Sequence, residues 1–460
     1  MTLPWRSVGI GLSLLVIVAV SLVPAGAYVP PVLAALLLLP WTFARPVRAM
    51  SVVILGNLMF LSTTEGISLP EIFFGTYLFG YLAFWAWKRV FLDRAPIIEH
   101  VSDYYLLAFF VICVATLPIT VFNGQTVLWW FRELLTFSHL LMYFPLRDSM
   151  RERKGMITLL VVLLGTFGLV AIYNLVTYRA ASAAVSYFWE LTASRQAVGD
   201  NFFFPGVVVL ISLWIHLQDR KAAWMLLPPL ALIALALALT FTRGFWLAAF
   251  LAIVVLFVFA GGRERLRLGL SALGGGLVGV FLVNVFLGRM GQSVLESLVS
   301  RMLSTRDATT DISFMNRLFE SKEAWKRILE QPILGHGVGA MFSRFDIIKH
   351  ETVETLYIHN GYLFLLFKVG LVGFIPYVFF LLIVVWTGIR LSFAKSVDDV
   401  QHAILRAFAA ILCAMLIVTT TSNVFIQKQA LLVLAFSTAC VMATHLRGER
   451  TPAAPMAISV

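Results

Sequence analysis

The chain alternates between long runs of apolar residues and short polar connections. Most runs are close to the ~20 residues that an α-helix needs to cross a bilayer, and most connections are only a few residues long. The pattern therefore predicts an all-α polytopic membrane protein with 12–14 transmembrane helices. The predicted helices lie near 7–24, 28–43, 50–62, 70–87, 103–121, 127–146, 155–177, 202–217, 222–240, 244–261, 266–288, 358–389, 403–421 and 426–446.

The composition supports this fold class and excludes others. Of the 460 residues, 60% are hydrophobic and 13% are charged, whereas a soluble domain carries about 25% charged residues. A soluble globular enzyme, a disordered chain and a single-span receptor are thereby excluded. Cys113, Cys413 and Cys440 all lie inside apolar runs, so neither a disulfide framework nor a zinc site is expected.

The basic residues predict how the chain is oriented in the membrane. The net charge of +11 comes mostly from short connections between runs, as the positive-inside bias requires, so no nucleic-acid partner is expected. Because the basic clusters fall in every second connection, we expect these connections and both termini to be cytoplasmic. The first run resembles a signal peptide, but its removal would break the alternation, so we interpret it as an uncleaved helix. The clusters are Arg45/Arg48, Lys88/Arg89/Arg94, Arg147/Arg151/Arg153/Lys154, Arg220/Lys221, Arg263/Arg265/Arg267, Arg390/Lys395 and Arg447/Arg450.

The longest connection on the opposite side contains a predicted amphipathic helix. Its apolar residues recur at helical spacing between charged ones, which favours a helix on the membrane surface or capping the bundle. Gln331-Pro332 should end this helix, and the glycine-rich stretch Gly335–Gly339 should form a tight loop. The apolar residues are Phe314, Leu318, Trp325, Ile328 and Leu329. The predicted organisation is transmembrane helices in 1–289, the long outer loop 290–357, transmembrane helices in 358–446 and a cytoplasmic tail 447–460.

Arginines on the outer side are informative because the charge bias disfavours them there. Arg243 lies in Thr242-Arg243-Gly244 between two apolar runs, at interface depth. Gly244 opens the next helix, so backbone N–H groups and a positive dipole end would lie beside the guanidinium. Arg195 precedes the eighth run in the same way. Two such arginines could clamp one phosphate-containing anion, and the alternative is that they anchor lipid headgroups.

His359 opens a long apolar run, where it can meet both water and a lipid-borne substrate. A neutral imidazole there can accept a proton from an attacking hydroxyl, and the alternative is that the segment only starts a helix, with Asn360 as its N-cap. His336 is also on the outer side and is a candidate supporting residue. No pair of outer carboxylates has a metal-binding spacing, so metal-free chemistry is favoured. Arg132-Glu133 is interpreted as an internal ion pair.

These residues together resemble the O-antigen ligase/polymerase superfamily of bacterial inner membranes. The resemblance covers roughly Arg195 to residue 389 and rests on three features: the outer Thr-Arg-Gly turn, Pro332-x-x-Gly-x-Gly-x-Gly, and His359-Asn360-Gly. It implies a fold similar to GT-C-like polyprenol-dependent glycosyltransferases. It also implies glycan transfer from undecaprenyl pyrophosphate in the periplasm, with no nucleotide sugar, cofactor or metal. The family's essential histidine and two arginines match His359, Arg243 and Arg195.

The resemblance favours one activity within this superfamily. An O-antigen ligase joins an undecaprenyl-pyrophosphate-linked glycan to the lipid A-core oligosaccharide in lipopolysaccharide biosynthesis. On this hypothesis Arg301 or Arg317 from the outer loop helps Arg195 and Arg243 to hold the pyrophosphate, and His359 deprotonates the acceptor. A glycan polymerase is the nearest alternative, and a protein O-oligosaccharyltransferase is less favoured because Tyr357 replaces the first histidine of its His-x-His-Asn motif. A transporter of a lipid-linked glycan is the alternative from a different class, although few ionisable residues besides His139 and Arg132-Glu133 lie within the runs.

Overall fold

The computed structural model of the chain describes residues 41–60, 69–183, 199–269, 299, 312–346, 350–394 and 399–450. Within these ranges the fold is almost entirely helical, and six helices are long and apolar enough to cross a membrane. The chain is therefore an all-α polytopic membrane protein, which confirms the predicted fold class. The six candidates are Val101–Phe122, Arg153–Ser182, Lys221–Leu239, Gly361–Ser392, Asp399–Val418 and Lys428–Glu449. The predicted total of 12–14 also counts runs 7–24, most of 28–43 and most of 266–288, which lie outside the described residues.

Most described helices follow the predicted apolar runs closely. Three runs are divided into shorter helices, and in two of them a proline stands just after the break. A proline has no backbone N–H to continue the helical ladder, so Pro118 starts α6 and Pro228 starts α13. The helices on undivided runs are α3 (Pro46–Gly56), α4 (Leu69–Trp87), α9 (Arg153–Ala183), α11 (Phe203–His216), α14 (Arg243–Phe259), α18 (Gly361–Ser392), α19 (Asp399–Val418) and α20 (Lys428–Arg450). The divided runs give α5 (Val101–Ala115) and α6 (Leu117–Phe122); α7 (Val127–Phe137), η4 (Ser138–Met142) and α8 (Tyr143–Met150); and α12 (Arg220–Met225) and α13 (Leu227–Leu239).

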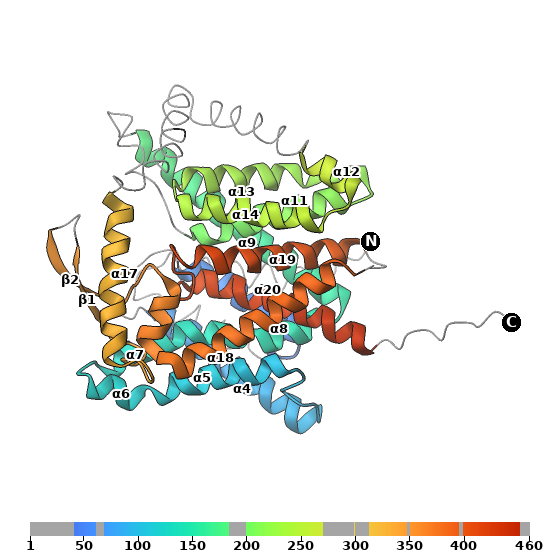
Figure 1. Cartoon of the computed structure of the whole chain (residues 1–460). Coiled ribbons are helices and arrows are strands. Elements are labelled where there is room, and N and C mark those ends of the chain that lie inside the picture. The colour runs from blue at the N-terminus through green and yellow to red at the C-terminus, as the bar shows by residue number, and fades with distance from the viewer. Residues whose placement is uncertain are drawn as a thin grey trace.

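Helices α19 and α20 form the centre of the bundle (Figure 1). The most apolar window of α20 is 83% buried, compared with 28% for the window in Val101–Phe122. Both central helices carry many alanines, and small side chains let neighbouring helix backbones approach closely in a membrane. The fully buried alanines include Ala407, Ala409 and Ala410 in α19 and Ala435 and Ala439 in α20. The packing of the bundle thus rests on its last two helices.

The connections predicted to be cytoplasmic lie together at one end of the bundle. Arg89 pairs with both Glu99 and Asp148, and buried Arg147 pairs with Asp103 at 2.6 Å. Contacts of this kind join residues from connections far apart in the sequence; for example, Arg447 donates to the carbonyl of Met150 at 2.8 Å. The ion pairs are buried and mutually compensated, so this end of the bundle is tied together by charge as well as by apolar packing.

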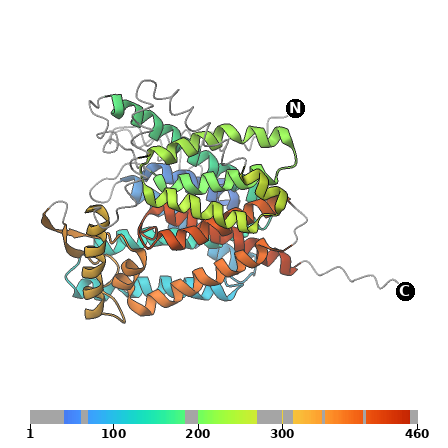
Figure 2. The same ribbon diagram turned by 45° about the horizontal axis from the view of Figure 1, so that its top comes forward.

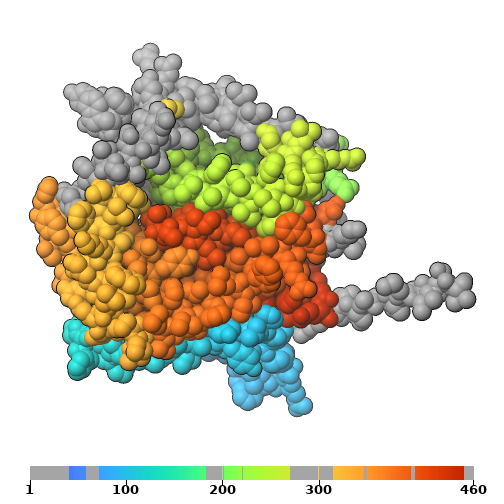
Figure 3. Space-filling view, in the orientation of Figure 1, coloured from blue at the N-terminus to red at the C-terminus, as the bar shows by residue number. Residues whose placement is uncertain are grey.

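The opposite end is covered by α17 (Ile312–Glu330) and a small antiparallel hairpin. Strand β1 (Phe342–Asp346) pairs with β2 (Glu351–Thr355), with Phe342 opposite Thr355. Figures 1 and 2 show α17 running crosswise to the long helices, with the hairpin beside it in both views. In the space-filling view α17 and the hairpin form one continuous face at this end (Figure 3).

Helix α17 confirms the predicted amphipathic helix, and most of its apolar face points away from the bundle. The residues that pack against the rest of the protein are Asn316, Glu320, Ala324 and Ile328, four residues apart. The predicted apolar residues Phe314, Leu318, Trp325 and Leu329 are all exposed, whereas Ile328 is buried. A polar stripe is buried because it makes specific hydrogen bonds to the site described below. The helix ends at Glu330, immediately before Gln331-Pro332 as expected.

The glycine-rich loop after α17 is inserted into a break in α18. Gly335, Gly337 and Gly339 all have positive φ, which favours glycine and confirms the predicted tight loop. Helix α18 is interrupted at Gly370, where φ is 58°. The backbone groups freed by the break bond the loop: Leu371 N–H donates to Pro332 O at 2.9 Å and Gly337 N–H donates to Lys368 O at 2.9 Å. The loop thereby fixes the C-terminal end of α17 against α18.

Candidate functional site

His359 lies between β2 and the first turn of α18. Asn360 is the N-cap of this helix, since its side-chain oxygen accepts the backbone N–H groups of Tyr362 at 3.0 Å and Leu363 at 3.2 Å. The capping interpretation of Asn360 is therefore confirmed, and it does not conflict with a chemical role for His359. A capped, rigid helix start holds the preceding residue in a defined place.

A buried glutamate of α17 contacts His359 at two points. The backbone N–H of His359 donates to Glu320 Oε1 at 2.9 Å, and Nδ1 of the imidazole lies 2.6 Å from Glu320 Oε2. The Glu320 side chain is only 1% exposed, whereas the His359 side chain is 29% exposed. One edge of the ring is thus held by a carboxylate, while the ring remains accessible from the surface.

Arg344 of β1 lies behind Glu320. Its Nε is 3.9 Å from Glu320 Oε2, and another guanidinium nitrogen is 3.2 Å from Asp346 Oδ2. Arg344 also donates to the side-chain oxygen of Asn316 at 3.3 Å. The Arg344 side chain is only 9% exposed. Its buried positive charge compensates the carboxylates of Glu320 and Asp346, which would otherwise be costly to bury.

The connection between α19 and α20 (residues 419–427) links the elements around His359. Gly361 N–H donates to Thr419 O at 2.9 Å, and the side-chain amide of Asn423 donates to Ile358 O at 2.9 Å. Arg317 of α17 donates to Thr421 O at 3.0 Å. This connection therefore contacts the main chain on both sides of His359 and a candidate phosphate-binding arginine.

The first turn of α14, which begins at Arg243, packs against the same connection through Gly244. The turn before this helix is made tight by Phe241, whose φ is 52°. Gly244 packs against Ser422 so closely that a Cβ placed there would lie 2.6 Å from Ser422 Oγ. The positive end of the α14 dipole and Arg243 are consequently both at the connection that holds His359. The first turn of α14 and the segment carrying His359 therefore contact the same connection.

Of the three remaining candidate residues, the structure describes only His336. His336 Nε2 bonds Arg327 O at 2.8 Å, and the imidazole stacks on Phe367 with ring centroids 4.6 Å apart. These contacts give His336 a role in seating the glycine-rich loop, and none of them is shared with His359. Arg195 and Arg301 lie outside the described residues.

The interpretation of Arg132-Glu133 as an internal ion pair is wrong. Glu133 pairs with Lys368 of α18 at 2.9 Å, and the same lysine donates to Ala340 O at 2.6 Å. Arg132 instead lies over the ring of Trp129, with 5.5 Å to the centroid. Residues i and i+1 of a helix point in different directions, so neighbours in the sequence rarely pair. The Lys368–Glu133 pair fastens the glycine-rich loop, because Glu133 also accepts the N–H of Gly339.

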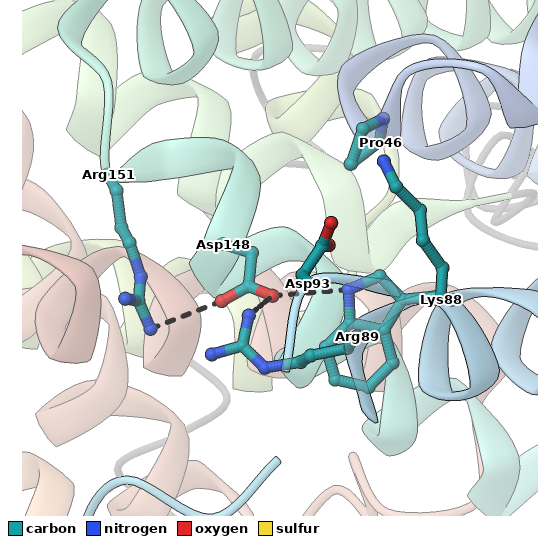
Figure 4. Close-up of a pocket in the computed structure, with 7 residues that line it drawn as sticks. Pro46, Lys88, Arg89, Asp93, Asp148 and Arg151 are labelled. Carbon is teal, nitrogen blue, oxygen red and sulfur yellow. Dashed lines mark hydrogen bonds and ion pairs between the residues drawn. The ribbon is translucent and has the colours of Figure 1, made fainter. Parts of the chain in front are cut away.

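A cavity of about 220 Å³ lies at the opposite end of the bundle. Figure 4 shows side chains that line it, among them Lys88 and Asp93, with Asp148 between its partners Arg89 and Arg151. It contains none of the candidate residues, and its arginines are paired with carboxylates of the charged network described above. Within the described ranges no group of three or more His, Cys, Asp or Glu residues could hold a metal ion.

Sequence reasoning placed Glu320 and Arg344 on the outer side but assigned neither to the site, and it missed the polar connection between α19 and α20. Glu320 had a weak signal, since it lies four residues after Asn316 on one face of α17. The connection had another, because Thr419-Thr420-Thr421-Ser422-Asn423 is an unusually polar ending for an apolar run. Neither signal identifies the partner, which is set by contacts between distant segments.

The fold and the site define a helical membrane protein with a polar, histidine-containing site at one end of its bundle. Residues 228–378 match the model of a family described as O-antigen ligase. Over this segment the chain is similar to that family, and the segment includes Arg243, Arg317, Glu320, Arg344 and His359. The family indicates a glycosyltransferase-like enzyme that acts on lipid-linked glycans. No curated protein matches the chain.

Proposed function

We propose that the protein is an O-antigen ligase of the bacterial inner membrane. It transfers a glycan from undecaprenyl pyrophosphate to the lipid A-core oligosaccharide during lipopolysaccharide biosynthesis. The observation that supports this most strongly is that Gly244 (next to Arg243), Arg317 and the segment carrying His359 all contact one polar connection. Arg243, Arg317 and His359 all lie in the stretch that matches the family. These are the groups that a pyrophosphate leaving group and a hydroxyl acceptor require.

The orientation we propose follows from the charges. The end that carries the basic connections faces the cytoplasm, together with both termini, according to the positive-inside bias. The end covered by α17 and the hairpin then faces the periplasm, where both lipid-linked substrates are presented. On this proposal 290–357 is a periplasmic loop, and α17 lies at the membrane surface with its exposed apolar face, including Trp325, toward the interface.

In the proposed mechanism arginines hold the donor and histidine activates the acceptor. Arg243, beside the first N–H groups of α14, binds the donor pyrophosphate together with Arg317, and we assign Arg195 and Arg301 to the same group. His359 takes the proton of the acceptor hydroxyl, whose oxygen attacks C1 of the donor sugar from the face opposite the leaving group. The C1–O bond breaks, undecaprenyl pyrophosphate departs with the bonding electrons, and the configuration at C1 inverts. Guanidinium groups stabilise the charge that develops on the departing phosphate oxygen.

A polymerase would use the same donor and the same residues, with a second lipid-linked glycan as its acceptor. We favour the ligase because the chain resembles that group most closely. A protein O-oligosaccharyltransferase is less favoured, because Tyr357 stands where that group has the first histidine of its motif; the Tyr357 ring packs edge-on to His359 with centroids 4.8 Å apart.

A transporter would be favoured by one observation, which is the break in α18 beside the buried Lys368–Glu133 pair. Broken helices with ionisable residues are typical of transport sites. Here, however, protein groups fill the break and the lysine is fully buried. We therefore attribute the pair to the structure of the loop.

The test is transfer in vitro with purified protein in detergent, using lipid-linked glycan and lipid A-core. Wild type should elongate lipid A-core, and His359→Ala should lose about 10²–10⁴-fold in rate. His350→Asn is the control, since His350 is an exposed histidine of the hairpin turn at φ 57°, a conformation that asparagine tolerates. Growth of the lipid-linked glycan with lipid A-core unchanged would identify a polymerase, and transfer at the wild-type rate by His359→Ala would refute the base assignment.

A further inference from the structure

Glu320 fixes both the main chain and the side chain of His359. Its two carboxylate oxygens are used separately, with Oε1 accepting the backbone N–H at 2.9 Å and Oε2 lying 2.6 Å from Nδ1. The glutamate comes from the buried face of α17, so the position of the imidazole is set by a packed helix. A histidine at a helix start would otherwise rotate freely about its side-chain bonds.

This contact determines where the imidazole carries its proton. An ionised carboxylate only accepts hydrogen bonds, so Nδ1 must be the protonated nitrogen. In the neutral ring Nε2 then has the free electron pair, on the edge opposite Glu320. Within the described part of the chain Nε2 of His359 has no hydrogen-bond partner, and the ring is 29% exposed although the carboxylate is 1% exposed. The basic nitrogen is therefore the one that a substrate can approach.

A buried positive charge lies beside the Glu320 carboxylate. Arg344 supplies the nearest positive charge, 3.9 Å from Oε2, and is itself held by Asp346 and Asn316. These side chains come from β1 and α17, so the hairpin and the crosswise helix jointly form a buried support behind the histidine. A catalytic group gains precision when its own partner is fixed by a further layer of contacts.

We propose that Glu320 is a positioning residue for the transfer reaction. It selects the tautomer with a basic Nε2, aims that nitrogen at the acceptor, and stabilises the imidazolium that forms when the acceptor hydroxyl gives up its proton. Glu320 stays ionised throughout and takes no proton itself. The inference rests on the proposed function, because it assumes that His359 is the base.

The first test is Glu320→Gln, which keeps the shape of the side chain but removes the charge and one of the two acceptors. The turnover number kcat should fall about 10–100-fold, while KM for the lipid-linked donor should change less than about threefold. Glu323→Gln is the matched control on the outer face of the same helix, where Glu323 pairs with Lys326 at 3.0 Å; it should leave both constants unchanged. A wild-type kcat in Glu320→Gln, or a loss confined to the yield of folded protein, would overturn the proposal.

A second variant and a double-mutant cycle separate positioning from a general structural effect. Glu320→Asp keeps the charge with a shorter reach, so its kcat should lie between those of Glu320→Gln and wild type; an equal loss in both variants would argue against the electrostatic part of the role. If Glu320 acts through His359, adding Glu320→Gln to His359→Ala should cause no further loss. If the loss in the double variant equals the product of the two single-variant losses, Glu320 does not act through His359. Wild-type activity in His359→Ala would refute the proposed base instead, whereas an inactive His359→Ala beside a fully active Glu320→Gln would refute only the positioning role.

Discussion

Asn423 donates its side-chain amide to the carbonyl of Ile358 at 2.9 Å, one residue before His359. Its side-chain oxygen accepts the N–H of Phe425 at 2.9 Å, so Asn423 also shapes its own connection. The residue is 1% exposed. A single buried amide thus joins the end of the bundle formed by α19 and α20 to the main chain of the histidine.

Asn423→Ala should reduce both stability and activity. Loss of the amide leaves the Ile358 carbonyl and the Phe425 N–H without partners, which costs about 1–3 kcal/mol for each buried group. Because His359 is released on one side, transfer should fall more than the lower melting temperature explains. Thr420→Ala is the control, since Thr420 is exposed and its hydroxyl donates to Ile417 O within the same turn at 2.7 Å. Equal effects of the two substitutions would refute the role of Asn423.

Arg243→Lys should weaken transfer severely. A lysine keeps the positive charge but lacks the planar fork that contacts two phosphate oxygens at once, so we expect a loss of about 10²–10³-fold in kcat/KM. Arg327→Lys is the control, because Arg327 is a surface arginine of α17 paired with Glu330 at 3.3 Å. The measurement is the initial rate of transfer over a range of donor concentrations. Near-normal rates in Arg243→Lys would mean that the residue anchors lipid headgroups.

Features set by the local pattern of the sequence could be predicted, whereas contacts between distant segments could not. The helices could be predicted because burial in lipid requires uninterrupted apolar runs. The differences are runs that divide into shorter helices, two of them just before a proline such as Pro118. Arg243, Arg317 and His359 could be proposed as candidates because cations and a histidine on the predicted outer side are individually unusual. Glu320 could not be assigned, since its partner is 39 residues away in the sequence and the pattern of α17 does not indicate which of its polar residues face the bundle.

The close contact between Gly244 and Ser422 should be sensitive to one added methyl group. Gly244→Ala places a Cβ 2.6 Å from Ser422 Oγ, so the start of α14 or the hydroxyl must move, and Arg243 moves with the helix. A catalytic group misplaced by 1 Å can lower the rate ~10²-fold. We expect a smaller effect here, a fall of about 10-fold in kcat/KM. The double variant Gly244→Ala/Ser422→Ala removes the hydroxyl and should recover most of the activity. Failure of that rescue would show that the contact does not position Arg243.

Transfer should not depend on a divalent metal. The proposed mechanism stabilises the leaving pyrophosphate with arginine side chains and the N-terminal end of α14, and it uses a histidine as base. Wild-type protein treated with EDTA and then passed into metal-free buffer should keep its full rate. The rate should also stay unchanged when Mg²⁺ or Mn²⁺ is added back. A loss with EDTA that either ion restores would contradict the arginine-based mechanism.

Gly370→Ala should prevent the glycine-rich loop from seating in α18. The residue has φ 58°, which disfavours any side chain, and a Cβ there would collide with the backbone of Ile333 and Gly335. Strain and overpacking together should cost at least about 3 kcal/mol. The loop carries the end of α17, so Glu320 would lose its place beside His359 and activity should fall with stability. Gly165→Ala in α9 is the control, because a Cβ at Gly165 meets no atom within 4 Å; it should melt at or slightly above the wild-type temperature. Equal melting temperatures for Gly370→Ala and wild type would show that the inserted loop does not hold this end of the bundle.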